Sequence, residues 1–296
     1  MAVGKTTSNL GMMYIGFKAA FKKAFDAADP EDWRRLATLV PSTTAAELYA
    51  WLGAFPSLRE WIGDRVIKQL ERHDYTIRNR TFESTIQVRV DDVEDDNFGL
   101  YGPLMADLGD QSRRWPAKLI FELLQQAITE LCYDGQPFFS KTHPENGTTA
   151  ANYNDADDAA PVYLFDTSRP LKPLIFQQRQ APQFAQQVRP DSDGVFMRDE
   201  YLYGVKARGN AGFGLWQQAY CTTATLNEEN FNAAYDAMSQ RVNDEGDLLG
   251  IRPTLMLVGA SNRAKADKLI NQRFWASGES NPLFHKVEVW STPLLP

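Results

Sequence analysis

Cysteine and histidine are scarce in this chain of 296 residues, which holds two cysteines and three histidines. Two cysteines, Cys132 and Cys221, give no disulfide framework in a chain of this length, so a reducing cytosol is the default environment. The histidines are too few and too scattered along the sequence to indicate a histidine-based metal site. We therefore expect neither a metal ion nor another cofactor.

Long hydrophobic runs are also missing. No segment approaches the roughly 20 apolar residues of a membrane span, and the N-terminal residues lack the apolar stretch and cleavage site of a secretory signal. The composition, with 43% hydrophobic and 23% charged residues, is typical of a soluble globular protein. We expect no membrane partner.

Basic residues are fewer than acidic ones: the chain has 31 lysines and arginines but 38 aspartates and glutamates, so its net charge is −7. This balance argues against a protein that reads nucleic-acid sequence, which needs a basic face. It is compatible with a protein that encloses nucleic acid without gripping it, since a wall that bound phosphate tightly would resist packing and release.

Catalytic motifs are absent from the sequence as well. Cys132, Asp134 and His143 lie in a turn-rich segment, 132–161, but neither a second histidine nor a nucleophile motif accompanies them. Their spacing fits no metal pattern. We favour a turn that leads into a buried pair, Phe138 and Phe139, and assign no catalytic or metal-binding residue.

Three clustered glycines, Gly209, Gly212 and Gly214, superficially resemble a nucleotide-binding loop. Their order matches neither the Rossmann nor the P-loop fingerprint. A close-packed or bulged strand is the better interpretation, and no cofactor-binding residue is assigned.

The longest helical pattern lies within residues 91–139. An acidic cluster opens it, and apolar side chains then recur at helical period, so one face is expected to be buried. The apolar stripe comprises Trp115, Leu119, Ile120, Leu123, Leu124, Ala127, Ile128 and Leu131. Pro116 removes a backbone donor within the pattern, so we expect a kink or a restart there.

Phe17, Phe21 and Phe25 recur every fourth residue near the N-terminus, with lysines between them. This spacing predicts an amphipathic helix with an aromatic edge. Such a helix binds a membrane surface or docks on its own core or on a neighbouring subunit, and we favour docking.

Residues 47–90 predict a strand followed by a long, hairpin-like excursion, which leaves the body of the protein near Gly53 and returns by Val90. Residues 47–53 have the pattern of a strand, and the following segment to residue 74 carries charges of both signs. From Tyr75 the pattern has period two, with Phe82, Ile86 and Val88 on one face. Because a hairpin alone is marginal in water, we expect neighbouring copies of the protein to hold it.

The C-terminal part predicts a small α/β unit. Its helices are expected at 225–240, where Thr225 and Glu228 form a capping box, and at 261–274, capped by Ser261. Its strands are expected at 252–258 and 287–290. Upstream, strands are expected at 162–165 and 174–176, and a loop from there to residue 194.

This order of elements resembles the major head (capsid) subunits of Mu-like phages and prophages. The resemblance rests on motifs spread over most of the chain, namely 16–21 (GFKAAF), 40–44 (VPSTT), 49–53 (YAWLG), 55–56 (FP), 58–61 (LREW), 63–65 (GDR), 93–96 (VEDD), 132–135 (CYDG), 166–176 (DTSRPLKPLIF) and 210–214 (NAGFG). It implies the α+β fold of tailed-phage major capsid proteins, also called the Johnson or Hong Kong ninety-seven fold.

By position, the resemblance implies five parts. These are an N-terminal arm at 1–40, an extended loop with base strands at 45–90, a peripheral domain at 91–219 with a long spine helix at 97–131, an axial domain at 220–286, and a strand at 287–296 that returns to the peripheral domain.

The implied function is that of a major capsid protein. It would self-assemble as hexamers and pentamers into an icosahedral shell around the double-stranded DNA of a tailed phage, in the host cytoplasm, and remain in the virion. Implied partners are a portal and a separate scaffold protein, since the chain has no room for a scaffold extension; a decoration protein stays open. The alternatives are another self-assembling virion protein, such as a tail-tube subunit, and an α/β enzyme or small-molecule-binding module.

Contacts between subunits are expected to combine aromatic anchors with charged groups of both signs. The candidate interface residues are Phe17, Phe21, Trp51, Phe55, Arg59, Glu60, Trp61, Asp64, Arg65 and Lys68. Some versions of this fold join a loop lysine covalently to an asparagine of a neighbour. Because Lys68 is the only lysine between Trp51 and Val90, we predict no such bond here.

Overall fold

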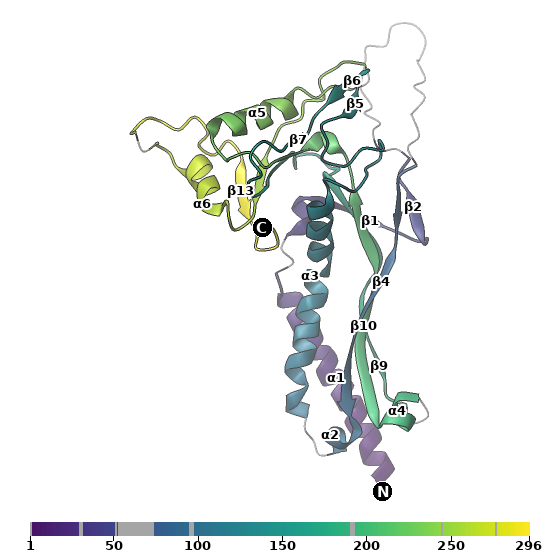
Figure 1. The fold of residues 1–296 in the computed structure, drawn as a ribbon. Helices are drawn as coiled ribbons and strands as arrows, with labels where there is room; N and C mark the ends of the chain where they lie inside the picture. Colours follow the sequence, from purple (N-terminus) through teal and green to yellow (C-terminus); the bar gives the residue numbers. More distant parts are fainter. Residues whose placement is uncertain are drawn as a thin grey trace.

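A long half and a broader α/β half make up the molecule, as a computed structural model shows (Figure 1). The structure describes residues 2–29, 32–50, 52, 74–94, 98–189, 193–243, 245–275 and 277–296. None of the described helices combines the length and the apolar character that crossing a bilayer requires. The mixture of helices and sheets agrees with the α+β class expected from the sequence.

Two long helices lie side by side along the long half (Figure 1). The first is α1 (Ala2–Ala27) and the second is α3 (Gly102–Gln126). The helix α3 runs through Pro116 without a break, so the expected restart is wrong. It is also shorter than the predicted 97–131, and Ile128 and Leu131, which follow its end, are 47% and 57% exposed.

A four-stranded sheet packs against these helices in the order β1-β9-β10-β4. Its strands are β1 (Ala37–Pro41), β9 (Leu174–Gln187), β10 (Glu200–Phe213) and β4 (Arg80–Arg89). The strand β1 is parallel to β9, and the other neighbours are antiparallel. In β4 the period-two pattern is confirmed, since Phe82, Ile86 and Val88 are the less exposed positions.

The strand β9 continues to Gln187, although we expected only a short strand at 174–176 and then a loop to residue 194. Its polar side chains and Pro182 make this strand difficult to recognise from the sequence. Pro182 and Ala181 together lie opposite the single residue Ala207, because Gln183 pairs with Lys206 and Gln180 with Arg208. This β-bulge accommodates a proline that a regular inner strand would not.

The excursion predicted at 47–90 is paired only at its base within the described residues. The strand β2 (Ala46–Leu48) pairs with β3 (Thr76–Arg78) over three residues. The next strand, β4, pairs with β10 instead of with an outgoing strand of the excursion. We call the segment between β2 and β3, residues 49–75, the excursion, and most of it lies outside the described residues.

A second sheet of five strands has the order β13-β12-β8-β11-β7. Its strands are β7 (Tyr153–Asn154), β8 (Val162–Phe165), β11 (Ala219–Thr222), β12 (Leu255–Val258) and β13 (Glu288–Ser291). One face joins the core that includes α3, and the other packs with α5 (Glu228–Ser239) and α6 (Arg263–Ala266).

Two sequence expectations for the α/β half, both about helix caps, need correction. Asn227 caps α5 in place of Thr225, because the Asn227 side-chain oxygen accepts a hydrogen bond of 2.8 Å from the Asn230 amide. The helix that begins at Arg263 changes into a π-helix (Asp267–Asn271) and has no side-chain cap. The strand expected at 287–290 is confirmed as β13, which pairs in parallel with β12, the strand expected at 252–258.

Shorter elements complete the described chain. They are a 3-10 helix (Trp33–Arg35), α2 (Val90–Glu94), a second 3-10 helix (Phe98–Leu100), β5 (His143–Glu145), β6 (Thr148–Ala150), α4 (Asp193–Arg198) and a third 3-10 helix (Trp216–Gln218).

Candidate functional site

Most of the candidate interface residues lie outside the described residues. These are Trp51, Phe55, Arg59, Glu60, Trp61, Asp64, Arg65 and Lys68. Their role therefore stays a prediction, and the structure bears on it only through the surfaces around them.

Phe17 and Phe21 are described, and the chain's own sheet covers them. They are 4% and 7% exposed. The Phe17 ring meets Tyr203 edge-on, with 5.0 Å between centroids, and Phe21 packs against Phe184 at 5.2 Å. Of the alternatives considered for this helix, the structure has the aromatic edge docked on the chain's own core. Contact between these two residues and a neighbouring copy stays a prediction.

The base of the excursion is tied to the four-stranded sheet by buried polar groups. The Tyr49 hydroxyl donates to Gln177 Oε1 at 2.9 Å, and Gln177 Nε2 donates to the Ile77 carbonyl at 3.1 Å. The Phe213 amide donates to the Tyr75 hydroxyl at 2.7 Å. Burial raises the pKa of Tyr49 to about 12, and it also raises the pKa of Tyr75, so both remain neutral phenols.

A groove of about 450 Å³ lies between α3 and β4, and we call it the α3–β4 groove. Apolar side chains line much of it, including Leu104 and Trp115 of α3 and Phe82 and Ile86 of β4. Charged residues of both signs also contribute to its lining, namely Glu83, Asp107, Arg114 and Lys118. Pro182 of β9 and Val205 and Ala207 of β10 also line it, so the groove lies over the face of the sheet, and among the described strands β4 is an edge strand with a hydrogen-bonded neighbour on one side only.

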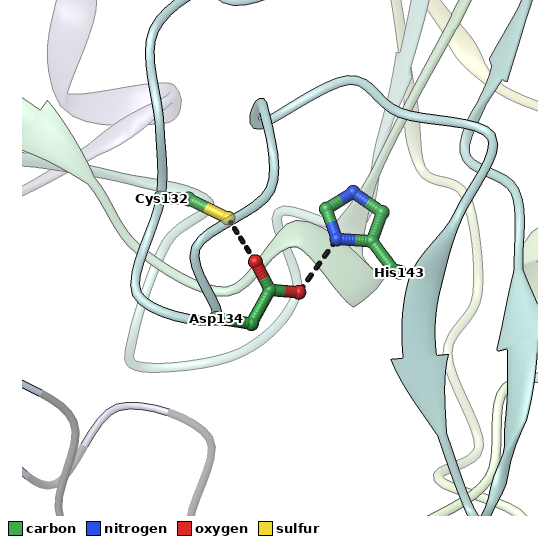
Figure 2. Close-up of side chains that lie close together, drawn as sticks. All are labelled: Cys132, Asp134 and His143. Atoms are coloured by element: carbon green, nitrogen blue, oxygen red, sulfur yellow. Dashed lines mark hydrogen bonds and ion pairs between the residues drawn. The ribbon is translucent and has the colours of Figure 1, made fainter.

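Cys132, Asp134 and His143 come together in a buried cluster between the end of α3 and the β5–β6 hairpin (Figure 2). The Cys132 thiol lies 3.0 Å from Asp134 Oδ1, and His143 Nδ1 lies 2.7 Å from Asp134 Oδ2. One carboxylate thus holds a thiol and an imidazole that lie eleven positions apart in the sequence. The sequence spacing of these three residues did not predict that their side chains would come together.

The far side of the His143 ring is also occupied. His143 Nε2 lies 3.3 Å from the Phe138 carbonyl and 3.2 Å from Asn152 Oδ1. The ring stacks on Trp216, with 4.0 Å between centroids and 6° between planes. No local sequence signal connects Asn152 or Trp216 with His143, because only the fold brings these segments together.

The protonation of the cluster follows from its hydrogen bonds. Burial alone would raise the pKa of Asp134, but the hydrogen bonds from His143 and Cys132 outweigh it and hold that pKa below its usual value. Burial and the adjacent Asp134 charge raise the pKa of the Cys132 thiol, so it is not a thiolate.

Chemically, the cluster is suited to holding the fold rather than to catalysis. A protonated and buried thiol is a poor nucleophile. The groups that could bind a metal ion already satisfy one another by hydrogen bonds, and the donor atoms lie within 4.8 Å of one another. The cluster joins the turn after α3 to the β5–β6 hairpin, and Phe138 and Phe139 are buried beside it as expected.

The three glycines in and after β10 are explained by close packing, which confirms the strand interpretation. A side-chain carbon at Gly209 would come within 2.6 Å of the Gln177 carbonyl, and one at Gly214 within 2.8 Å of the Lys172 carbonyl. At Gly212 it would collide with the Ile77 side chain. The glycines therefore let neighbouring segments approach the strand.

Comparison with known proteins gives consistent matches over nearly the whole chain. Residues 10–295 match the model of the family described as Mu-like prophage major head subunit gpT. The major capsid protein of Escherichia phage Mu is 38% identical over 96% of this chain and 97% of its own length. The Mu-like prophage FluMu major head subunit of Haemophilus influenzae is 38% identical over 89% of each chain.

Solved structures match equally broadly. A chain of the procapsid of bacteriophage JBD30 superposes with a TM-score of 0.83 and 44% identity, over 97% of this chain and 98% of that one. A chain of the JBD30 capsid gives a TM-score of 0.81 and 33% identity, over 91% and 92% of the two chains. A third match is a chain of the JBD30 capsid decorated with minor capsid protein trimers, with a TM-score of 0.79.

Proposed function

The chain belongs to the family of Mu-like prophage major head subunits, and from this membership we propose that it is the shell-forming subunit of a tailed phage. Copies assemble as hexamers and pentamers into an icosahedral shell that encloses double-stranded DNA and becomes part of the virion. The observation that carries the proposal is the family match over residues 10–295. The net charge of −7 is consistent with a wall that does not grip the packaged DNA.

The division into parts is also a proposal. The long half, with α3 and the four-stranded sheet, corresponds to the peripheral domain, and α5, α6 and the five-stranded sheet correspond to the axial domain. On this division the axial part also takes in β7, β8 and β13, because these strands pair in the five-stranded sheet. The strand β13 and the tail beyond it both contact α3, since Trp290 packs on Phe121 with 5.7 Å between ring centroids and Gln125 Nε2 donates to the Leu294 carbonyl at 2.8 Å.

Contacts between neighbouring copies centre on the excursion between residues 49 and 75. Trp51, Phe55 and Trp61 supply aromatic anchors, and the surrounding charges of both signs supply a polar rim, as is usual at interfaces. Phe17 and Phe21 contribute by holding α1 in place, so that its exposed Met12, Ile15 and Lys18 face outward.

The α3–β4 groove is the receiving surface that suits this excursion. It offers apolar side chains together with charges of both signs, and the candidate residues of the excursion have the same two properties. Among the described strands, β4 is an edge strand that can accept an extended segment. We therefore assign a second copy of the chain, through its excursion, as the occupant of the groove.

Assembly requires partners other than the chain itself. A portal and a separate scaffold protein are part of the proposal, and a decoration protein is supported by the structural relative whose capsid carries minor capsid protein trimers. The chain has no catalytic role in this proposal, because the cluster at Asp134 consists of mutually satisfied groups.

Two substitutions test the contact. Trp61→Ala removes an anchor, and Leu104→Glu places a charge in the groove at a residue that is 49% exposed. Both subunits should fold, judged by circular dichroism and thermal melting, and both should give few shells when expressed with the phage assembly proteins. Leu104→Met is the matched control and should assemble normally. Shells of normal yield from both test variants would refute this interface.

A further inference from the structure

The turn that precedes the excursion is organised around one carboxylate oxygen. Glu47 Oε1 accepts hydrogen bonds from the Ser42 hydroxyl at 2.8 Å and from the Thr43 and Thr44 amides at 3.0 and 3.1 Å. It also accepts one from the Thr44 hydroxyl at 2.9 Å. The Thr44 hydroxyl also lies 2.6 Å from the Ala46 carbonyl, so its one hydrogen is shared, and Glu47 Oε1 joins the Ser42 hydroxyl and two backbone amides into one turn.

Asn79 connects the returning chain to the same turn. Its side-chain Nδ2 donates to Ser42 Oγ at 2.8 Å and to the Thr44 carbonyl at 2.9 Å. Its backbone amide donates to the Ala45 carbonyl at 2.9 Å. The outgoing and returning passes of the excursion are therefore closed into one unit, which we call the Glu47 anchor (Ser42, Thr43, Thr44, Glu47 and Asn79).

The strand pairing beside the anchor is short, and the hydrogen bonds of Tyr49 and Tyr75 hold it at the end next to the excursion, so the Glu47 anchor holds the opposite end. The strands β2 and β3 share three residue pairs, and a two-stranded hairpin is marginal in water even when longer. The hydrogen bonds of Glu47 lower its pKa to about 2, with those from Ser42 and Thr44 contributing most, so the carboxylate stays ionised and its bonds stay charge-assisted.

The anchor contributes little to the core of the molecule. Thr43 and Thr44 are exposed, and Glu47 is partly exposed. Its loss removes polar contacts at the surface and leaves the buried apolar clusters intact. The most direct effect of the anchor is therefore on the base of the excursion, where residues 45–48 lie beside residues 76–79.

We infer that Glu47 is a positioning residue for assembly, which orients the excursion so that it meets the neighbouring subunit at a fixed angle. This inference rests on the proposed function, because it assumes that the excursion contacts a neighbour. Asn79 shares the role, since it ties the returning pass to the turn that Glu47 shapes.

The test uses Glu47→Ala and Asn79→Ala in the full chain. Thr43→Ala is the matched control, because the anchor uses only the backbone amide of Thr43. In the unassembled subunit, amide hydrogen exchange should become about tenfold faster at Asn79 and its neighbours in both test variants, while both variants stay folded and melt in one cooperative transition. The control should match the unaltered protein in both measurements.

Mixed assembly gives the decisive readout. Tagged variant subunits are expressed with an excess of unaltered subunits, and the tagged fraction in purified shells is compared with the input. We expect Glu47→Ala and Asn79→Ala to be depleted several-fold and Thr43→Ala to enter in proportion. Proportional entry of the two test variants would overturn the inference, and so would global unfolding of both, since the role would then be one of stability.

Failure of the proposed function would look different. If the unaltered chain forms no shells, the assembly proposal fails, and the exchange measurement alone still decides whether Glu47 orders the base of the excursion. If unaltered shells form and the test variants enter them freely, only the positioning role fails.

Discussion

Asp134 carries the most consequential polar contacts of the buried cluster, because its carboxylate satisfies both Cys132 and His143. We predict that Asp134→Ala destabilises the subunit by about 3 kcal/mol, since it leaves buried polar groups without a partner. Chemical denaturation of the unassembled subunit measures this loss. Asp155→Ala is the matched control, because it breaks an exposed pair with Lys141 and should have no resolvable effect. Equal effects of the two substitutions would contradict the structural role of the cluster.

Acid should lower the folding stability of the subunit by protonating carboxylates that accept hydrogen bonds in the folded chain. The pKa values of Asp134 and Glu47 are lower in the folded chain than their ordinary values of 3.8 and 4.5. The unfolded chain therefore takes up protons first as the pH falls, so the stabilisation is complete above these ordinary values and is lost below them. For Glu47 the loss should fall between pH 4.5 and about 2.

Denaturation midpoints measured at a series of pH values test this prediction. The midpoint should drop through that acidic window, and Glu47→Gln should flatten part of the drop, because it removes one of the titrating groups. The lowered pKa values of Asp134 and Glu47 would be contradicted by a denaturation midpoint that does not change on acidification. The lowered pKa of Glu47 would also be contradicted if Glu47→Gln showed the same dependence of the midpoint on pH as the unaltered protein.

At the scale of the helices and strands, the contact between α1 and α3 depends on one small residue, Gly109. Gly109 of α3 lies directly against the backbone of Phe21 and Phe25, and a side-chain carbon there would collide with the Phe21 carbonyl. We predict that Gly109→Ala costs about 1–3 kcal/mol and loosens α1, because the backbone of a packed helix cannot yield cheaply.

Hydrogen exchange along residues 13–25 is the measurement for that contact. Gly102→Ala provides the control, since Gly102 has no atom within 4 Å of the added carbon and a compatible alanine does not destabilise. Unchanged exchange of α1 in Gly109→Ala would show that the two helices are not held by this close approach.

Sequence periodicity identified the elements whose burial follows a simple repeat. The face of β4 and the buried residues Leu119, Ile120 and Leu124 of α3 follow such repeats and were predicted correctly. Sequence reasoning failed where distant pairing decides the structure. The strand β9 has polar side chains and Pro182, and only its partner β10 makes it a strand. The Asp134 cluster and the Glu47 anchor were missed for the same reason, since both depend on residues brought together by folding.

For the whole molecule, we predict a shell held by non-covalent contacts. Lys68 is the only lysine between Trp51 and Val90, and we expect no covalent bond between it and a neighbour. Mature shells that are boiled and run on a denaturing gel should give a single band of subunit size. A ladder of covalent oligomers would contradict this expectation.

The most direct test of the central claim is electron microscopy of the protein expressed with its neighbouring assembly genes. We predict closed icosahedral shells built of hexamers and pentamers, in which residues 49–75 of each copy reach the α3–β4 groove of a neighbour. Open tubes would favour a tail-tube subunit, and a monomer that stays dispersed would favour a small-molecule-binding protein. Either of those results would contradict the account.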